Sequence, residues 1–349
     1  MSGPSPPAKA AAPIAADEAA ALFADLEPIP RLLVAVSGGP DSVALLGLLS
    51  EWADVPGRPA LMAATVDHGL RKGSAEEAER VAALCRRLGV PHATLQWTGL
   101  KPRTGLQAQA RSARYLLLGN EAQRLGGAGL ITAHTADDQA ETILMRMAHG
   151  SGPAGLIGMK VRSERDGFVL LRPLLGVTKA RLLATAQARG LPFVTDPSNA
   201  EPRFERVRWR ALLPVLAGEG LDAVRLSVLS RRLARMEAAL EHHARLLRAS
   251  LALPATAPDA VRIAFAPLAD EPEDVALRVL AATVAEVAAL GPMRLERLEA
   301  CIEALLCAAR EGRAITRTLS GCVLSLSRSG VLTIRREGMR RRGVHPAAS

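Results

Sequence analysis

Short apolar segments alternate with longer amphipathic segments over the first 150 residues of the chain. The apolar segments are predicted to be strands, and they cover residues 31–36, 60–66, 93–97 and 129–133. A helix is predicted after each of these strands. Strands that alternate with helices form parallel βαβ units, so we expect an α/β fold with a parallel sheet and helices on both faces.

The second half of the chain has a different pattern. A long helix is predicted for residues 221–251, followed by a strand at 261–265 and two helices at about 272–290 and 294–308. Three short strands are then expected, near residues 314–319, 322–328 and 331–336. This order predicts a smaller α+β domain, which the long helix joins to the first domain.

These patterns also suggest domain boundaries. Residues 1–28 are rich in Pro and Ala and are expected to form a flexible N-terminal tail. The first domain is expected to cover residues 29–216, the linker helix 217–252 and a small basic domain 253–349. Loops and turns are predicted where Gly, Pro and Asn gather, at residues 150–158, 172–176 and 196–202.

Composition and charge narrow the possible classes of protein. The 349 residues include 44 Lys and Arg against 35 Asp and Glu, and this net charge of +9 suggests an anionic partner such as nucleic acid. Because 39 of the basic residues are Arg, a general bias toward Arg is an alternative explanation. No uncharged apolar run approaches the ~18 residues of a membrane span. The four cysteines form no CxxC pair, which disfavours a zinc site, and the start of the chain lacks an export signal, so a cytoplasmic location is expected.

A glycine-rich turn between the first strand and the first helix is the strongest candidate for a binding site. The turn consists of Ser37, Gly38, Gly39, Pro40, Asp41 and Ser42. Two glycines permit unusual backbone angles and close approach, and the start of the helix adds a positive dipole end that favours an anion. The two serine hydroxyls add donors, and Asp41 could hold a divalent cation against phosphate oxygens. The alternative is a helix-capping turn with a structural glycine pair.

Two further polar segments follow predicted strands directly. They are Asp67-His68-Gly69-Leu70-Arg71 and His134-Thr135-Ala136-Asp137-Asp138. In parallel sheets ligands bind beyond the carboxyl ends of the strands, so we expect both segments to lie near the glycine-rich turn.

The turn resembles the PP-loop of the N-type ATP pyrophosphatases, which cleave ATP between the α- and β-phosphates. Other segments, in the same order and at similar intervals, resemble the tRNA(Ile)-lysidine synthetase family within that superfamily. They are the segments at residues 66–71, 110–115, 134–142, 172–175 and 196–199. The resemblance covers roughly residues 30–215, and the segments at 318–321 and 334–337 are similar more loosely to the end of the family's small C-terminal domain. The chain departs from the family at Val207, where Asn is frequent, and it is expected to stop short of a second C-terminal domain.

The resemblance implies a ligation in two steps. ATP, with Mg²⁺ near Asp41, would adenylate the C2 oxygen of the wobble cytidine in the CAU anticodon of tRNA(Ile) and release pyrophosphate. The ε-amine of free L-lysine would then displace AMP. Residues 37–42 would bind pyrophosphate, and Arg111 or Arg114 would balance the developing negative charge.

The second step needs an anionic pocket for the lysine ammonium, and Asp137, Asp138 and Glu141 could supply it. Asp137 and Glu141 are four residues apart, so they share one face of a helix. We expect Asp137 to be the closer contact and His134 to orient the substrate or transfer a proton. The alternative is that these acids only complement the helix dipole.

Two basic regions are candidates for binding tRNA. Residues 203–210 combine four arginines with Phe204 and Trp209, although Trp209 is expected to pack inward. Residues 301–349 contain nine arginines and three glutamates, a local net charge of +6. The expected partners are tRNA(Ile), free lysine and no membrane, with the protein a monomer or homodimer.

Two other functions stay open at this point. One is a PP-loop tRNA thiolase, although thiolases of this type usually need CxxC cysteines. The other is a non-catalytic RNA-binding protein that uses nucleotide as a switch, which would tolerate the loss of Asp41 and Asp137.

Overall fold

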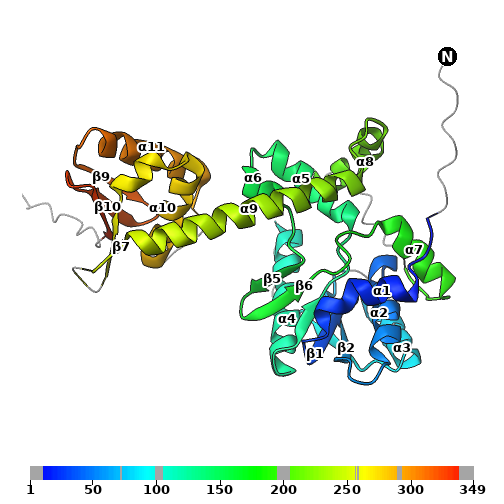
Figure 1. The fold of residues 1–349 in the computed structure, drawn as a ribbon. Coiled ribbons are helices and arrows are strands. Elements are labelled where there is room, and N and C mark those ends of the chain that lie inside the picture. The colour runs from blue at the N-terminus through cyan, green and yellow to red at the C-terminus, as the bar shows by residue number, and fades with distance from the viewer. Residues whose placement is uncertain are drawn as a thin grey trace, which may run out of the picture. The chain divides into compact units, whose positions relative to one another are not determined.

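The structure, a computed structural model, describes residues 11–70, 73–98, 105–194, 205–255, 257, 259–288 and 293–337 (Figure 1). The chain divides into two compact units, one of Met1–Ser151 with Gly155–Arg231 and the other of Gly152–Ala154 with Arg232–Ser349. The boundary at residue 231 lies inside the long helix α9 (Ala223–Leu251). Across the described residues, no helix has both the length and the apolar character needed to cross a membrane.

The first unit contains a six-stranded sheet in the order β3-β2-β1-β4-β6-β5. Its strands are β1 (Arg31–Ala35), β2 (Ala60–Asp67), β3 (His92–Gln96), β4 (Gly129–Ile131), β5 (Arg162–Arg165) and β6 (Phe168–Leu171). Five of the strands are parallel, which confirms the predicted α/β class, whereas β5 pairs antiparallel with β6 at the edge. This hairpin was not predicted. Asp166 and Gly167 at its turn both have positive φ, 45° and 81°, as a tight hairpin turn requires.

Helices cover both faces of this sheet, as the sequence predicts. They are α1 (Ala16–Phe23), α2 (Pro40–Ala53), α3 (Ser74–Arg87) and α7 (Lys179–Ala188) on one face and α4 (Leu106–Arg124) on the other. The unit also contains α5 (Ala136–Ala148) and α8 (Glu205–Gly218), which share a separate small core cluster. Side chains alternate along β1, because Leu32 and Val34 join one core cluster and Leu33 joins the other. The first cluster contains residues of α1, α2, α3 and α7, and the second contains residues of α4.

The prediction of a flexible tail over residues 1–28 is wrong for residues 11–28. These residues form α1 and a short 3₁₀ helix (Ala24–Leu26), and the side chains of Ile14 and Phe23 are buried in the first core cluster. The Phe23 ring packs edge-on against Trp52 of α2, with the ring centroids 5.7 Å apart. The Pro and Ala content of residues 1–28 resembles that of a flexible tail, but Ala19 and Phe23, one helical turn apart, give α1 a buried face. Residues 1–10 lie outside the described part of the chain.

Residues 150–158, predicted as a loop, contain the one-turn helix α6 (Pro153–Leu156). The segment that follows it is fixed to α5 by Gln139, whose amide nitrogen donates to the carbonyls of Ile157 at 2.9 Å and Met159 at 3.0 Å. Gly158 has a φ of 74°, and a Cβ there would lie 2.7 Å from the Gln139 side chain. Only glycine fits this close approach.

The second unit is an α+β domain, as predicted. Its antiparallel sheet has the order β7-β8-β11-β10-β9, with β7 (Ala252–Leu253), β8 (Ala260–Ala264), β9 (Ile315–Leu319), β10 (Cys322–Leu326) and β11 (Val331–Arg336). A 3₁₀ helix (Ala266–Asp270), α10 (Glu273–Val287) and α11 (Leu295–Arg310) complete the unit. One core cluster joins the sheet, these helices and the C-terminal part of α9.

Candidate active site

The glycine-rich turn connects β1 to α2, where the sequence places it. Gly38 has a φ of 84°, a left-handed conformation that other residues rarely adopt. Gly39 is the N-cap of α2 and has no side-chain capping bond, and Pro40 occupies the first turn. The backbone N–H groups of Asp41 and Ser42 therefore begin the helix without an intrahelical acceptor. An uncapped helix start of this kind favours an anion.

The two serines of the turn hold the turn itself together. The Ser42 hydroxyl donates to the Gly39 carbonyl at 3.0 Å and accepts the Ser37 amide at 3.1 Å. The hydroxyls of Ser37 and Ser42 lie 3.2 Å apart. Ser42, with 6% exposure, thus fixes the backbone conformation of the turn. The Val194 amide donates to the Gly38 carbonyl at 2.9 Å, so the chain after α7 also fixes this turn.

The acids after β4 lie at the start of α5, and Thr135 caps that helix. The Thr135 hydroxyl accepts the Asp138 amide while the Asp138 carboxylate accepts the Thr135 amide, which forms a capping box. The other Asp138 oxygen accepts a hydrogen bond from the Lys179 ammonium at 2.9 Å. Burial alone would raise the pKa of Asp138, but Lys179 and Thr135 hold this pKa below its ordinary value. Asp138 is therefore an ionised acid with a cation already beside it.

Lys179 also contacts the neighbouring acid. Its backbone amide, at the first residue of α7, donates to the Asp137 carboxylate at 2.8 Å. Asp137 forms no ion pair with a side chain in the described residues, whereas Asp138 does. Lys179 is not among the site residues predicted from the sequence. The signal available was its rarity, because it is one of only five lysines in a chain rich in arginine, and it follows a turn-rich segment.

Glu141 lies one turn further along α5 and faces a different element. Its side chain has 0% exposure, and its carboxylate accepts a hydrogen bond from Arg210 of α8 at 2.8 Å. A second arginine of α8, Arg206, lies 3.8 Å from the same carboxylate. The shared helix face predicted for Asp137 and Glu141 thus does not give the two acids a common partner. Glu141 holds α8 against α5, and a contact between Glu141 and substrate stays a prediction.

The charges around Asp41 show that the glycine-rich turn and the acids lie close together. Burial raises the pKa of Asp41 to about 6. Lys179 opposes this rise, and the negative charges of Asp138 and Asp137 add to it. Arg210 also lowers the pKa of Asp41. Because such interactions weaken steeply with distance, the ends of β1 and β4 place these groups in one electrostatic cluster.

His134 lies at the end of β4 and is neutral at physiological pH. Its Nδ1 is 2.8 Å from the Thr132 hydroxyl. Burial lowers the pKa of His134 to about 4; Asp138 opposes this shift, and Arg172 and Arg111 reinforce it. A neutral imidazole donates one hydrogen bond and accepts another, but it does not carry a positive charge toward a substrate.

The end of β2 carries the remaining polar segment, and there His68 lies next to helix α4. The His68 Nε2 lies 3.0 Å from a guanidinium nitrogen of Arg114. Arg111, one turn earlier on α4, lies over the Tyr115 ring with its guanidinium carbon 5.2 Å from the ring centroid. Arg71, at the end of the same predicted segment as His68, lies outside the described residues.

The described residues of the basic segment 203–210 lie in the first turns of α8, and their side chains face different surroundings. Arg206 and Arg210 face Glu141, and Arg208 is exposed. Trp209 packs against the small core cluster between α5, α8 and α9, which confirms the expectation that it points inward. Arg203 and Phe204 lie outside the described residues, as does the 196–202 turn.

Comparisons with known proteins agree with this site. The PP-loop domain family matches residues 12–216. The tRNA(Ile)-lysidine synthase of Rhodopseudomonas palustris is 48% identical over 324 residues, which covers 90% of this chain and 93% of that protein. The enzyme of the same name from Methylobacterium nodulans is 50% identical over 315 residues, with 89% and 92% covered.

The fold also resembles a solved structure. The U34-tRNA thiolase NcsA from Methanococcus maripaludis, with its [4Fe-4S] cluster, matches with a TM-score of 0.54 at 17% identity, covering 63% of this chain and 77% of that chain. At this identity the likeness shows the fold alone. The family match and the curated relatives show more, because each extends over most of the residues that build the site. The chain therefore belongs to the tRNA(Ile)-lysidine synthase family of PP-loop ligases, which act with ATP.

Proposed function

We propose that this ligase joins free L-lysine to C2 of the wobble cytidine in the CAU anticodon of tRNA(Ile). The names of the relatives support this substrate pair. The observation that carries the proposal is the electrostatic cluster around Asp41, because it joins an anion-binding turn to acids that can receive an amine. ATP and an amine would thus be held side by side, as a ligation requires.

In the first step, the C2 oxygen of cytidine attacks the α-phosphorus of ATP. A new oxygen–phosphorus bond forms, the bond between the α-phosphorus and the bridging oxygen breaks, and pyrophosphate leaves. The turn at residues 37–42 would bind the departing phosphates through backbone N–H groups. Arg111 and Arg114, on α4, are the proposed cations for the charge that develops on the tRNA side.

Mg²⁺ is the expected metal of this step, and Asp41 is its proposed ligand. In the described residues no group of three or more His, Cys, Asp or Glu side chains is arranged to hold a metal ion. A site with the single carboxylate of Asp41 is compatible with Mg²⁺, which is often bound through one or two carboxylates together with substrate phosphates. The raised pKa of Asp41 fits as well, since a buried carboxylate beside other acids gains most from a cation. When bound, the metal would neutralise phosphate charge.

In the second step, the ε-amine of lysine attacks C2, the C2–O bond breaks and AMP leaves. Of the three acids on α5, Asp138 is paired with Lys179 and Glu141 is paired with Arg210. Asp137 forms no ion pair within the described residues and is therefore the proposed site for the lysine ammonium, whose proton it would accept. Neutral His134 would orient the amine or the base, not hold a charge.

Two remaining expectations belong to this proposal. The second unit is proposed to bind the body of the tRNA, because arginines are abundant in residues 301–349. The reaction is proposed to take place in the cytoplasm, where ATP, lysine and tRNA are available together.

The test is incubation with ATP, radiolabelled lysine and a tRNA(Ile) transcript, followed by digestion to nucleosides. Label is expected in a modified cytidine at the wobble position, and a transcript with uridine at that position is the matched control. Label that is absent, or equal in both transcripts, would refute the proposal. If labelled sulfur entered the tRNA instead, the alternative function of a tRNA thiolase would replace the proposed ligation.

A further inference from the structure

Helix α7 meets the acids of the candidate active site with its first turn. The Lys179 amide donates to the Asp137 carboxylate at 2.8 Å, and the Lys179 ammonium donates to Asp138 at 2.9 Å. The Val177 carbonyl, two residues earlier, accepts the Ala136 amide at 2.8 Å. Three hydrogen bonds therefore join the start of α7 to the start of α5. A small shift or rotation of α7 would change the contacts of Lys179 with both acids.

One face of α7 is bound by the part of the chain that precedes β1. Arg181, Thr185 and Arg189 are four residues apart and therefore share this face. Each of them contacts the segment of residues 12–18, which we call the N-terminal brace. The Arg181 guanidinium donates to both oxygens of the Glu18 carboxylate, at 2.6 and 2.7 Å. These hydrogen bonds hold the pKa of Glu18 below its ordinary value, so the contact is between two charged groups.

The other contacts of the N-terminal brace use its backbone. The Ile14 amide donates to the Thr185 hydroxyl at 2.9 Å, and the Ile14 carbonyl accepts a hydrogen bond from Arg189 at 3.2 Å. The Thr185 hydroxyl in turn donates to the Arg181 carbonyl at 2.7 Å. Because Thr185 has 0% exposure, water cannot take the place of Ile14 at this hydroxyl.

A second face of α7 packs in the first core cluster, where Leu182 and Ala186 are buried together with residues of α2. The Ile14 side chain belongs to the same cluster, so the N-terminal brace is itself anchored in the core. Apolar packing is not directional and allows a helix to slide or rotate slightly. Hydrogen bonds are directional, so those of the N-terminal brace fix α7 along and around its axis.

We propose that Glu18 and Thr185 are positioning residues of the ligase, through which the N-terminal brace holds α7 so that Lys179 stays against the acids of α5. The charge of Lys179 also acts on Asp41, so the N-terminal brace would maintain the balance of charge across the candidate site. This inference rests on the proposed function for the roles of the acids in the reaction.

The first test measures the reactivity of the Lys179 amine by reductive methylation and mass spectrometry. Lys179 is one of only five lysines in the chain, and the other four serve as internal references. The brace variant is Glu18→Ala combined with Thr185→Val, which removes contacts with Arg181 and Ile14. An ammonium in contact with a carboxylate gives up its proton less readily, so methylation of Lys179 should become about threefold faster in the brace variant.

The matched control is Glu27→Ala combined with Thr283→Val. Glu27 also precedes β1, but its partner is Arg58, which does not belong to α7. Thr283 is buried in α10 and donates to a carbonyl of its own helix at 2.6 Å, as Thr185 does in α7. The control thus loses one ion pair and one buried hydroxyl without a change in α7. Its Lys179 should be methylated at the wild-type rate.

An unchanged rate in the brace variant, or an equal rise in the control, would overturn the inference, because the N-terminal brace would then only stabilise the fold. Glu18→Ala alone changes a partly exposed side chain and should raise the rate in the same direction, so the test does not require the double variant to fold. Thr185→Ser keeps the hydroxyl and, in place of Thr185→Val, should return the rate toward the wild-type value.

The second test follows lysine-dependent pyrophosphate release against pH. In the brace variant the acidic limb should move up by about half a pH unit, which is about threefold in rate at pH 5, because Lys179 acts less on Asp41. The other charges that act on Asp41, those of Asp138, Asp137 and Arg210, stay in place.

The same brace changes made in a Lys179→Met background should cause no further shift of the limb, since both act through one side chain. A further shift of equal size would overturn the route through Lys179. Wild-type protein that incorporates no lysine into tRNA would instead refute the proposed function, and the methylation rates would still decide whether the N-terminal brace positions Lys179.

Discussion

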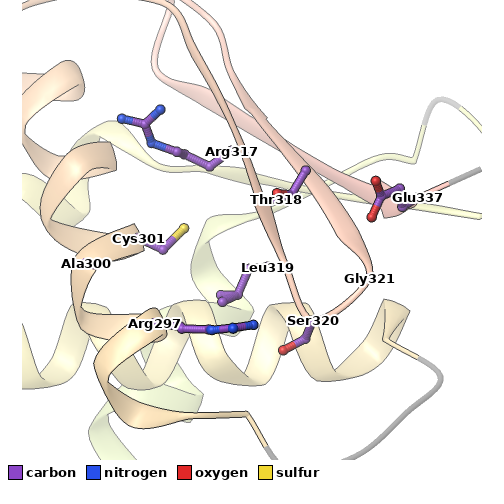
Figure 2. A pocket seen from close by; sticks show the side chains of 9 residues that line it. All are labelled: Arg297, Ala300, Cys301, Arg317, Thr318, Leu319, Ser320, Gly321 and Glu337. Carbon is purple, nitrogen blue, oxygen red and sulfur yellow. The ribbon is translucent and has the colours of Figure 1, made fainter.

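The acids on α5 of the first unit and two arginines of the second unit, Arg297 and Arg317, are held in opposite ways. In the first unit the acids on α5 lie against cations of the same chain, so that Asp138 contacts Lys179 and Glu141 contacts Arg210. In the second unit Arg297 and Arg317 line an open hollow without partners in the described residues (Figure 2). Paired and buried charges are preorganised for chemistry, since they need little rearrangement when a transition state forms. Unpaired and exposed positive charges favour capture of an anion, and salt strongly weakens this attraction.

The comparison predicts the largest effect at Asp41. Replacing Asp41 with Asn keeps the size of the side chain and removes the charge that would face the metal and the phosphates. Lysine-dependent pyrophosphate release is expected to fall by about 10³-fold, the usual scale for one group that stabilises a transition state. Binding of tRNA should stay within about twofold. A variant that keeps full turnover would remove Asp41 from the mechanism.

The contact between the buried Glu141 and the partly exposed Arg210 predicts a sizeable effect on folding. Glu141→Gln removes the charge that accepts the Arg210 hydrogen bond and faces Arg206, and the free energy of unfolding should fall by about 2 kcal/mol. The control is Glu51→Gln, which breaks the more exposed contact with Arg189 and should cost no more than about 1 kcal/mol. Urea denaturation measures both values. Equal losses of stability in the two variants would mean that the burial of Glu141 does not strengthen its contact with Arg210.

The same Asp41→Asn variant should be more stable than the wild type above about pH 4, with a difference that grows up to about pH 6 and then levels off. The pKa of Asp41 is about 6 in the folded chain against an ordinary value of 3.8, so ionisation of Asp41 disfavours the folded state. The cost is absent when both states are protonated, below about pH 4, and it grows to at most about 3 kcal/mol as pH rises through 6. Urea denaturation at pH 7.5 and pH 4 tests this. A stability difference that does not change with pH would contradict the buried, acid-rich setting of Asp41.

A smaller effect is expected at Lys179. Lys179→Met leaves Asp138 and Asp41 without their nearest cation, so the pKa of Asp41 should rise and the acidic limb of the activity profile should move to higher pH. Activity at pH 5 should fall about tenfold, which corresponds to about one pH unit of displacement, whereas activity at pH 7 should fall only about twofold. Lys179→Arg keeps the charge and should restore most of the profile. An unchanged limb in Lys179→Met would show that its ammonium does not act on Asp41.

Much of the first unit could be predicted because the apolar residues of its strands and helices recur at the spacing typical of each kind of element. The three polar segments follow strands directly, and the rule for parallel sheets then places them at one edge. The hairpin of β5 and β6 was missed because its strands have only four residues each, although the Asp166-Gly167 pair was a usable turn signal. Helix α1 was missed because its composition resembles that of a disordered tail.

The pairing of the acids could not be predicted from spacing. Spacing along α5 shows which residues share a face, but not which other helix covers that face. Lys179 and Arg210 come from α7 and α8, which lie 41 and 69 residues beyond the acids that they contact. The hollow of the second unit, between α11 and the β9–β10 hairpin, could not be predicted either, because it forms only when these elements pack beside each other.

The most direct test of the account is trapping of the intermediate with ATP labelled at the α-phosphate. Without lysine, the wild type is expected to transfer label to the wobble cytidine of the tRNA(Ile) transcript, and added lysine should release that label as AMP. Asp137→Asn should form the labelled tRNA and release AMP slowly when lysine is added, whereas Asp41→Asn should form almost none. Label that never reaches the tRNA, or that leaves it at the same rate with and without lysine, would contradict a site in which a phosphate-binding turn and an amine-binding acid act together.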